Sequence, residues 1–286
     1  MSSSESHLSL FDAHCHLQDE RIFEQSATVL EEAKRQGVRY VSVNGCCEED
    51  WPRVEKLAIS SDHQVIANFG CHPWFLEKRS ETWLAKLREA LVRNPGAGLG
   101  EVGLDRSPKV LQQTAFDIQV DLLLQQFRLA KELERVVSIH CVKAWGKMQE
   151  CLQEEGPYPA GVVLHSFVGP VEVVKGLARL NAFFSLSLSI LRLKEDKARA
   201  VINGIPLDRM LLETDAPDAL CRPKWNGITV GDSISSIQNG TGKELNHPGN
   251  VKAVLKLVAQ VTGHSEETIA SATFANACRL FLKQNP

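Results

Sequence analysis

The sequence predicts a single-domain α/β fold, a (β/α)8 barrel of the TIM type, and three observations support this prediction. Short apolar runs alternate with longer amphipathic stretches, eight such runs occur, and no change in composition marks a second domain between residues 1 and 286. The repeated β-then-α order predicts parallel strands joined by right-handed crossovers, and eight such strands can close into a barrel. A doubly wound open sheet is the alternative, but no Gly-x-Gly-x-x-Gly turn follows the first apolar run.

The periodicity places the elements in order along the chain. The expected strands are residues 8–12, 38–43, 65–69, 98–102, 136–140, 161–165, 182–186 and 210–213. The expected helices between them are 26–36, 49–60, 80–93, 112–132, 143–154, 170–179 and 194–203. A segment rich in Gly, Asn and Ser, residues 224–249, follows the last strand, and helices 250–261 and 266–282 end the chain. We expect this long segment to be a flexible loop, either a flap over the site or a surface insertion.

Composition and charge limit the classes of function. Hydrophobic residues make up 43% of the chain, so a large core is possible, and the net charge is −3 with a pI of about 6.3. Nucleic-acid binding driven by a basic surface alone is therefore excluded, whereas bound divalent cations could supply positive charge locally. The eight cysteines form no Cys-x-x-Cys pair, which disfavours a zinc finger and is typical of free thiols in a reducing compartment.

Targeting signals are not recognisable at the polar, Ser-rich N-terminus. No apolar run approaches the roughly 18 residues that a membrane span requires. We therefore expect a soluble intracellular protein of the cytoplasm and/or nucleus, without a membrane partner and monomeric.

The first expected strand ends in a His-x-His pair. Strand alternation places Asp12, His14 and His16 on one face and Ala13 and Cys15 on the other. Two imidazoles on one face can hold a metal ion from one side, although a solvated pair of histidines is the alternative. Cys15, like the other cysteines beside strand-end histidines, Cys71 and Cys141, is expected to pack against the helices.

Further metal-ligating residue types follow later strands. In a barrel of this type the active site lies at the C-terminal ends of the strands. The side chains expected there after the first strand are His72, Glu101, His140, His165 and Asp215. Taken singly, either His140 or His165 could be a core histidine, and either carboxylate could cap the helix that follows it. Taken together, the set indicates a metal centre.

Two divalent ions, Mg, Zn or Mn, suit this set better than one. Four histidines and two carboxylates exceed the roughly four ligands of a single zinc ion. Glu101 would bridge the two ions. His14, His16 and Asp215 would then bind one ion, and His140 and His165 the other. Asp215 would also orient the attacking water and accept its proton as general base.

The chain resembles the TatD family of metal-dependent deoxyribonucleases, within the amidohydrolase-like hydrolases. The motifs that carry the resemblance are FDAHCHL at 11–17, GCHP at 70–73, GEVGLD at 100–105, SIHC at 138–141, HSFVG at 165–169, LETDAP at 212–217 and NACRLF at 276–281. The resemblance implies a TIM-type barrel, two divalent metal ions, DNA as the substrate and hydrolysis of its phosphodiester bonds as a 3′-5′ exonuclease. Asp105 is expected to orient a ligand rather than to bind metal.

The chain departs from the family pattern where substrate would bind. The family commonly has an arginine after the His-Cys pair, whereas this chain has Val142 followed by Lys143. It also has Arg106 where the family commonly has an aromatic residue. Candidate substrate-binding residues are therefore His72, Arg106 and Lys143, and the 224–249 segment is longer than the usual family loop.

Two other functions remain open from sequence. An amidohydrolase or deacylase that cleaves a C–N or ester bond in a small molecule or aminoacyl group could use the same ligands. A glutamate at position 101, where many such enzymes have a modified lysine, favours the nuclease. A non-catalytic nucleic-acid-binding barrel is disfavoured by the complete ligand set and by the few aromatic residues near expected loops, Trp74, Trp145 and Trp225.

Overall fold

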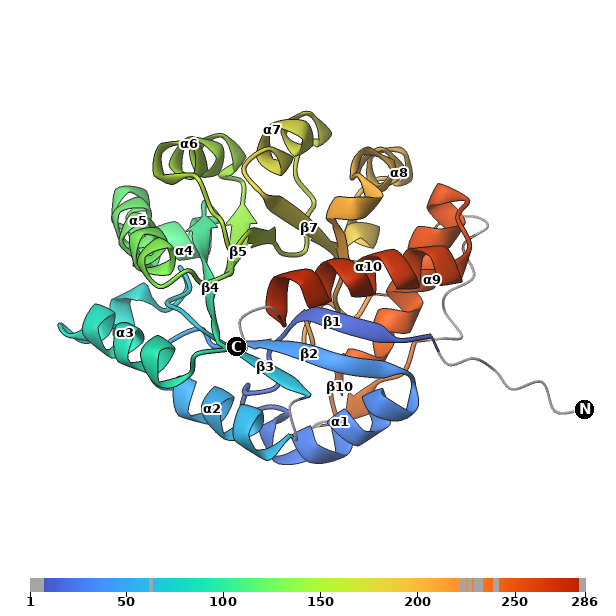
Figure 1. Cartoon of the computed structure of the whole chain (residues 1–286), viewed down its shortest axis with the longest axis horizontal. Helices are drawn as coiled ribbons and strands as arrows, with labels where there is room; N and C mark the ends of the chain where they lie inside the picture. Colours follow the sequence, from blue (N-terminus) through green and yellow to red (C-terminus); the bar gives the residue numbers. More distant parts are fainter. Residues whose placement is uncertain are drawn as a thin grey trace, which may run out of the picture.

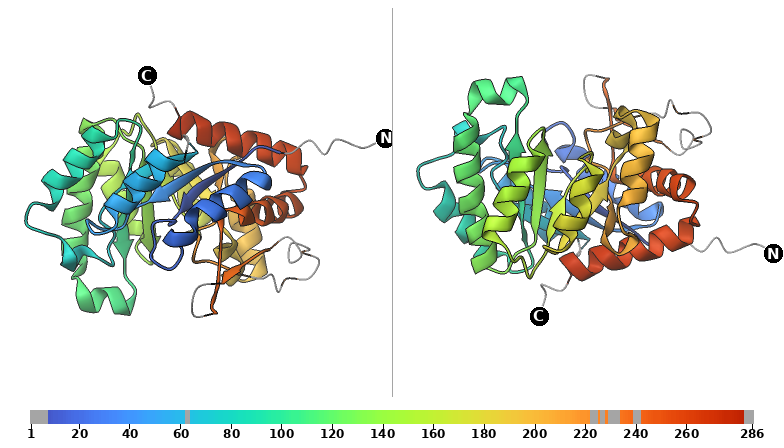
Figure 2. Two further views of the ribbon diagram at one scale, coloured as in Figure 1. Left: turned by 90° about the horizontal axis from the view of Figure 1, so that it is seen from below. Right: turned by 90° about the horizontal axis from the view of Figure 1, so that it is seen from above.

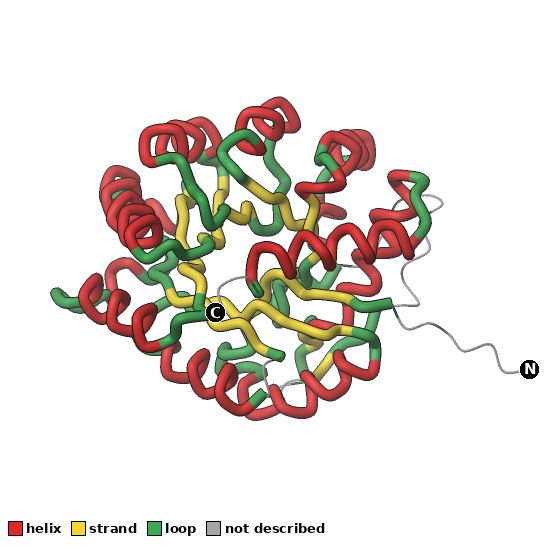
Figure 3. The backbone as a smooth tube through the Cα atoms, viewed as in Figure 1, coloured by secondary structure: helices red, strands yellow, loops and turns green. Residues whose placement is uncertain are grey.

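The structure, a computed structural model, describes residues 8–61, 64–221, 225, 228, 234–238 and 242–282. One eight-stranded parallel sheet in the order β1 to β8 curves into a barrel, as predicted (Figures 1 and 3). Its strands are β1 (Leu10–Cys15), β2 (Val38–Asn44), β3 (Val65–Phe69), β4 (Gly98–Asp105), β5 (Val137–Val142), β6 (Val162–Leu164), β7 (Ala182–Leu186) and β8 (Met210–Leu212). The predicted order and number of strands are confirmed.

The helices surround the barrel on its outside (Figure 2). They are α1 (Ser26–Arg35), α2 (Trp51–Ser60), α3 (Trp83–Arg93), α4 (Pro108–Gln113), α5 (Phe116–Glu132), α6 (Trp145–Glu155), α7 (Val174–Ala178), α8 (Glu195–Gly204), α9 (Val251–Thr262) and α10 (Glu266–Phe281). The prediction of one helix over residues 112–132 is wrong at its start, because residues 112 and 113 belong to α4 and the longer helix α5 begins at Phe116. Thr114 and Ala115 have extended backbone, which ends α4 and begins α5 after a break. None of the described helices is long and apolar enough to cross a membrane.

The alternation predicted for β1 is also partly wrong. Ala13 packs in a cluster with Val163 and Leu211, whereas Cys15 packs in the larger cluster together with helix residues. The pairing of β1 with β2 shifts register between Asp12 and Cys15. Such an irregularity turns successive side chains away from strict alternation. The strand also continues beyond residue 12, so His14 lies within β1.

The barrel closes between β1 and the chain that follows β8. The buried Asp12 carboxylate accepts hydrogen bonds from the backbone N–H and the hydroxyl of Thr214, at 2.8 and 2.5 Å. The backbone N–H of Asp215 donates to the His14 carbonyl at 2.9 Å, and that of His16 donates to the Ala216 carbonyl. The end of β1 is therefore fixed against residues 214–216, and the first and last predicted ligands lie side by side.

Helix α10 covers the end of the barrel opposite the strand C-termini. Phe281 stacks on Phe11 with ring centroids 5.4 Å apart, and both belong to the cluster that fills the barrel near the strand starts. Asn276, buried in α10, donates hydrogen bonds to the carbonyls of Leu207 and Met210, both at 2.9 Å. These contacts attach the last helix to β8.

Only parts of the predicted loop 224–249 are among the described residues. They include a two-stranded antiparallel ladder of β9 (Ile237–Gln238) and β10 (Glu244–Leu245). His247, whose environment the sequence left open, is buried and hydrogen-bonded to the Ser235 hydroxyl at 2.7 Å. The expected flexibility concerns residues 224, 226–227, 229–233 and 239–241 as well, and these lie outside the described residues.

Replacing Asn276 should destabilise the fold without touching the metal-ligand cluster. Asn276→Ala leaves two buried carbonyls without their side-chain donor, and we expect a loss of about 1–3 kcal/mol in the free energy of unfolding, measured by urea denaturation. Ser271→Ala, at an exposed position of the same helix, is the control and should change it by less than about 0.5 kcal/mol. Equal stabilities of the two variants would contradict a stabilising role for the hydrogen bonds that attach α10 to β8.

Candidate metal centre

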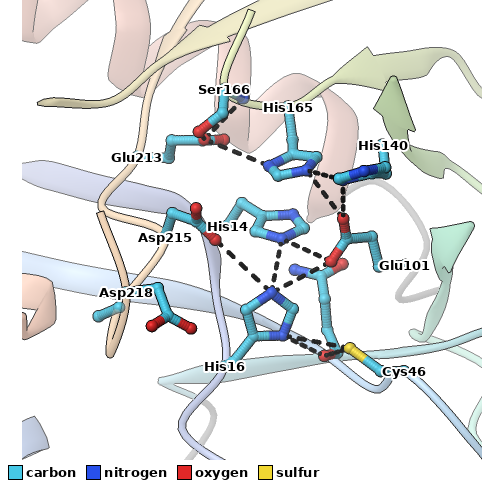
Figure 4. A network of polar contacts seen from close by, with 12 residues as sticks. His14, His16, Cys46, Glu101, His140, His165, Ser166, Glu213, Asp215 and Asp218 are labelled. Carbon is cyan, nitrogen blue, oxygen red and sulfur yellow. Dashed lines mark hydrogen bonds and ion pairs between the residues drawn. The ribbon is translucent and has the colours of Figure 1, made fainter. Parts of the chain in front are cut away.

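A buried carboxylate, Glu101 of β4, lies among five histidines, and Figure 4 shows four of them, His14, His16, His140 and His165. Its Oε2 atom lies 3.3 Å from His14 Nε2 and 3.1 Å from His16 Nε2. Its Oε1 atom faces three other rings, at 2.8 Å from His165 Nε2, 3.1 Å from His140 Nδ1 and 3.2 Å from His72 Nε2. The two oxygens of one carboxylate therefore face two different histidine groups.

Asp215 lies beside the first group, as Figure 4 shows. Its Oδ1 atom is 3.6 Å from His16 Nε2, and its ligand atom also falls in a cluster with those of His14 and His165. The backbone of Asp215 is left-handed, with φ of 57°, a conformation that is costly for a residue other than glycine and often occurs at functional sites. The six predicted ligands thus come together from within β1, β4 and β5 and from the residues that follow β1, β6 and β8.

The outer ring nitrogens of four histidines face acceptors. His16 Nδ1 lies 2.8 Å from the Asn44 carbonyl, and His14 Nδ1 lies 2.9 Å from the Ser138 hydroxyl. His140 Nε2 is 3.2 Å from Asp105 Oδ2. His165 Nδ1 is 3.5 Å from Glu213 Oε1, a longer contact. A neutral His16 then carries its proton on Nδ1, because a carbonyl can only accept, and the lone pair of its Nε2 points at Glu101. The same tautomer in the other three rings would direct their inner lone pairs at Glu101.

His72 has the opposite arrangement. Its Nδ1 atom accepts a hydrogen bond from the backbone N–H of Trp74 at 3.1 Å, so a neutral His72 carries its proton on Nε2. That nitrogen then donates to Glu101 instead of offering a lone pair. Although His72, Glu101 and His140 are close enough to form a ligand cluster by distance, the hydrogen bonds distinguish His72 from the other four rings.

The residues fit a bound cation. The His14 and His16 Nε2 atoms lie 3.2 Å apart and both face Glu101 Oε2, so three acceptor atoms converge. On the other side, His140 Nδ1 and His165 Nε2 lie 3.4 Å apart and face Oε1. Converging lone pairs and negative charge in a buried place need positive charge between them, and a divalent ion with N and O ligands provides it.

Burial shifts the protonation of the site. It lowers the pKa of His14 to about 4, as does the neighbouring His165, and it lowers the pKa of His72 to about 4. Burial would raise the pKa of Glu101, but the facing histidines, His165 foremost, hold it well below its usual range. Burial raises the pKa of Asp215 to about 6. Around neutral pH, Glu101 and Asp215 are therefore ionised while His14 and His72 are neutral.

Several buried polar residues that the sequence analysis missed hold this arrangement. Two glutamines of α5 fix the strand-end loops from outside. Gln119 accepts from the Asp105 N–H and Gln126 accepts from the Cys71 N–H, both at 2.8 Å. Glu213 accepts from the Ser166 N–H and hydroxyl, both at 2.7 Å, and from the Ser185 hydroxyl. In the sequence, these two glutamines lie seven residues apart on the apolar face of an amphipathic helix, and this pattern could have indicated that they hold buried backbone groups.

A pocket of about 790 Å³ opens over the cluster. His72, His140, His165 and Asp215 line it, and so does Val142. The other two predicted substrate-binding residues, Arg106 and Lys143, are exposed but are not among the described lining residues. The Arg106 guanidinium instead lies 3.8 Å from the centroid of the Phe116 ring.

The cysteines beside the strand-end histidines pack as predicted. Cys15, Cys71 and Cys141 are buried in the main hydrophobic cluster. Burial raises the pKa of the Cys141 thiol to about 12, which keeps it protonated. Cys46 and Cys47, and also Cys141, line the pocket, and the Cys46 Sγ atom lies 3.6 Å from His16 Nδ1.

The barrel and its buried His, Glu and Asp cluster define the class, a metal-dependent hydrolase of the TIM-barrel type. Residues 11–282 match the family described as TatD related DNase. The chain belongs to this family, as its motifs indicated.

Individual relatives are similar along nearly their whole length. The metal-dependent hydrolase YabD of Bacillus subtilis is 31% identical over 276 residues, which cover 95% of this chain and 98% of YabD. The human protein named Deoxyribonuclease TATDN3 is 30% identical, over 96% of this chain and 95% of TATDN3. The crystal structure of YjjV, a TatD homologue from Escherichia coli, superposes with a TM-score of 0.82 at 28% sequence identity. The superposition covers 96% of this chain and 98% of the YjjV chain.

Metal retention should distinguish His72 from the other histidines. We expect His140→Ala to lose bound metal, since it removes a lone pair from the cluster, and His72→Ala to keep it, because its Nε2 is a donor. The measurement is metal content by mass spectrometry after zinc loading and desalting. His264→Ala, at an exposed position, is the control. Loss of metal from His72→Ala would place His72 among the ligands.

Proposed function

We propose that the chain is a two-metal deoxyribonuclease that hydrolyses phosphodiester bonds at the 3′ ends of DNA. One observation carries the two-metal part of this proposal. Glu101 directs Oε2 at His14 and His16 and Oε1 at His140 and His165, which is the geometry a bridging carboxylate requires. DNA as the substrate is supported by membership in the TatD related DNase family.

Each part of the cluster then has a role. When bound, two divalent ions lower the pKa of a water molecule near them and offset the charge of a phosphodiester. His14, His16 and Asp215 would hold one ion, and His140 and His165 the other. Asp105 and Glu213 would orient His140 and His165 through their outer nitrogens.

Asp215 is the proposed general base. Its carboxylate lines the pocket next to His16, and burial raises its pKa. A divalent ion beside it would favour the ionised form, which is the form that can accept a proton from the attacking water. The left-handed backbone that directs this side chain is held by the hydrogen bond from its N–H to the His14 carbonyl.

His72 is the proposed donor to the substrate phosphate. Its Nε2–H points at the cluster, and the Trp74 N–H fixes this tautomer. The Nε2–H lies against Glu101 Oε1 in this structure. When that oxygen engages a metal ion, the N–H would be released to donate to a phosphate oxygen, and His72 would not compete for metal.

Arg192 is a further candidate for phosphate binding, in place of Arg106 and Lys143. It lines the pocket and is exposed. Arg21, another lining cation, is engaged by both Asp19 and Asp218, at 2.8 and 2.7 Å. The Arg192 guanidinium makes no hydrogen bond or ion pair to any residue within the described ranges, so it is available for phosphate.

End-labelled DNA tests the proposed activity directly. The protein is incubated with single- and double-stranded oligonucleotides labelled at either end, with magnesium, manganese or zinc in turn. Stepwise shortening from the 3′ end is expected. Aryl esters and N-acyl amino acids, offered under the same conditions, test the amidohydrolase alternative, and cleavage of these but not of DNA would overturn the proposal.

Asp215→Asn should reduce DNA hydrolysis by on the order of 10²–10⁴. The substitution keeps an oxygen that can serve as a ligand but removes the base and one negative charge. The rate is measured in single turnover at saturating metal, so that weaker metal binding is separated from slower chemistry. An unchanged rate would exclude Asp215 as the base.

Salt dependence should separate Arg192 from Lys143. If Arg192 contacts a backbone phosphate, Arg192→Ala raises KM for DNA and reduces the slope of log(kcat/KM) against log[salt] by about 1. Lys143→Ala removes a cation that does not line the pocket and is the matched control. Identical slopes for Arg192→Ala and the parent would leave Arg192 without a phosphate contact.

A further inference from the structure

Trp74 presents an exposed aromatic ring at the wall of the pocket. Its side chain is 52% exposed, and it is the only aromatic residue among the large exposed hydrophobics within the described ranges. It follows His72 directly and lines the same pocket as the metal-ligand cluster. A large apolar surface left open next to a catalytic site indicates a contact with substrate.

The ring is held in one orientation although it is exposed. Its indole N–H donates to Asp105 Oδ2 at 2.7 Å. It packs edge-on against His72, with ring centroids 5.2 Å apart and an interplanar angle of 87°. The His140 ring centroid is 6.2 Å away. An exposed ring fixed in this way loses little side-chain entropy when a ligand stacks on it.

The surroundings fit a nucleotide. Phe75 lines the pocket next to Trp74. The Lys78 Nζ atom lies 5.7 Å from the centroid of the Phe75 ring and 3.7 Å from Glu49 Oε2, an exposed ion pair that a phosphate could displace. The pocket volume of about 790 Å³ is that of a small-molecule site, too small to enclose a duplex end. An aromatic face beside a cation is the combination that single-strand-binding proteins use for base and backbone.

We propose that Trp74 stacks on an unpaired nucleobase next to the bond that is cleaved, so that the enzyme acts on unpaired strand ends. This inference rests on the proposed function, since it names the form of DNA that the same site accepts. A paired base is already stacked between its neighbours, whereas an unpaired base can turn onto the ring. Every base has an aromatic face, so this contact selects strand state and not sequence.

The hydrogen bond to Asp105 requires a careful choice of variants. Removing Trp74 also removes a donor from the carboxylate that contacts His140, which could disturb the cluster without any role in stacking. Trp74→Phe and Trp74→Leu both remove the indole N–H, and only the phenylalanine keeps an aromatic face. The difference between these two variants therefore isolates stacking.

The experiment measures binding and cleavage with two oligonucleotides. One is a single strand of ordinary sequence, and the other carries base-free tetrahydrofuran residues at its last two 3′ positions. Binding is followed by fluorescence anisotropy, with protein that has been treated with chelator and then supplied with calcium. Cleavage is followed with manganese. Metal content is measured for both variants.

Stacking predicts a specific pattern. Trp74→Leu should bind the ordinary strand about 5- to 150-fold more weakly than Trp74→Phe, which is the range that loss of one base–aromatic stack produces. The two variants should bind the base-free strand equally. The parent should cleave a strand with an unpaired 3′ end faster than a blunt duplex, and Trp74→Leu should reduce this preference.

Two outcomes would overturn the inference, and they can be distinguished. If the parent cleaves DNA but Phe and Leu variants bind the ordinary strand equally, Trp74 has no stacking role and the proposed function stands. If the parent neither binds nor cleaves any oligonucleotide with any metal, the proposed function fails together with the inference.

Discussion

The site depends on one buried carboxylate, Glu101, and on the histidines that face it. A buried charge without partners is costly, and here five imidazoles lie within 3.3 Å of its two oxygens. Three of these rings have their outer nitrogens in hydrogen-bond contact with residues of other strands: His14 with Ser138, His16 with Asn44 and His140 with Asp105. These contacts hold the three rings facing Glu101. The cost of this polar core is offset when positive charge occupies it, which is why the arrangement belongs to a metal-dependent hydrolase.

Closure of the barrel between β1 and β8 produces the second constraint. Asp12 accepts two hydrogen bonds from Thr214, and the carbonyl of His14 accepts the N–H of Asp215. Candidate ligands from β1 and from the segment after β8, about 200 residues apart in the sequence, thereby come to one place. A change in these hydrogen bonds would move His14 and Asp215 together. The relative position of Asp215 and the β1 histidines is consequently coupled to the stability of the barrel itself.

The sequence predicted the strand order and the convergence of six candidate ligands, because each candidate lies in or just after an apolar run and parallel strands end on one side of a barrel. It could not predict the break at Thr114 or the register shift after Asp12, since both depend on packing and not on local pattern. The tautomer of His72 was also out of reach, because it depends on one hydrogen bond from the Trp74 backbone. Arg192 enters the pocket from the segment after β7, at a position that no motif marks.

In the proposed deoxyribonuclease, the charge around the pocket would link DNA binding to metal binding. The carboxylates of Asp19, Glu20, Glu49, Asp50, Asp215 and Asp218 outnumber the lining cations, and the net charge of the chain is −3. Arg21 is neutralised by two of these carboxylates. Such a rim repels a phosphate backbone, so the protein without metal should hold DNA weakly. Divalent ions at Glu101 would reverse the local charge where the scissile phosphate lies, and affinity and chemistry would then come from the same place. The remaining contacts, from Arg192 and the Trp74 ring, would determine which part of a strand reaches it.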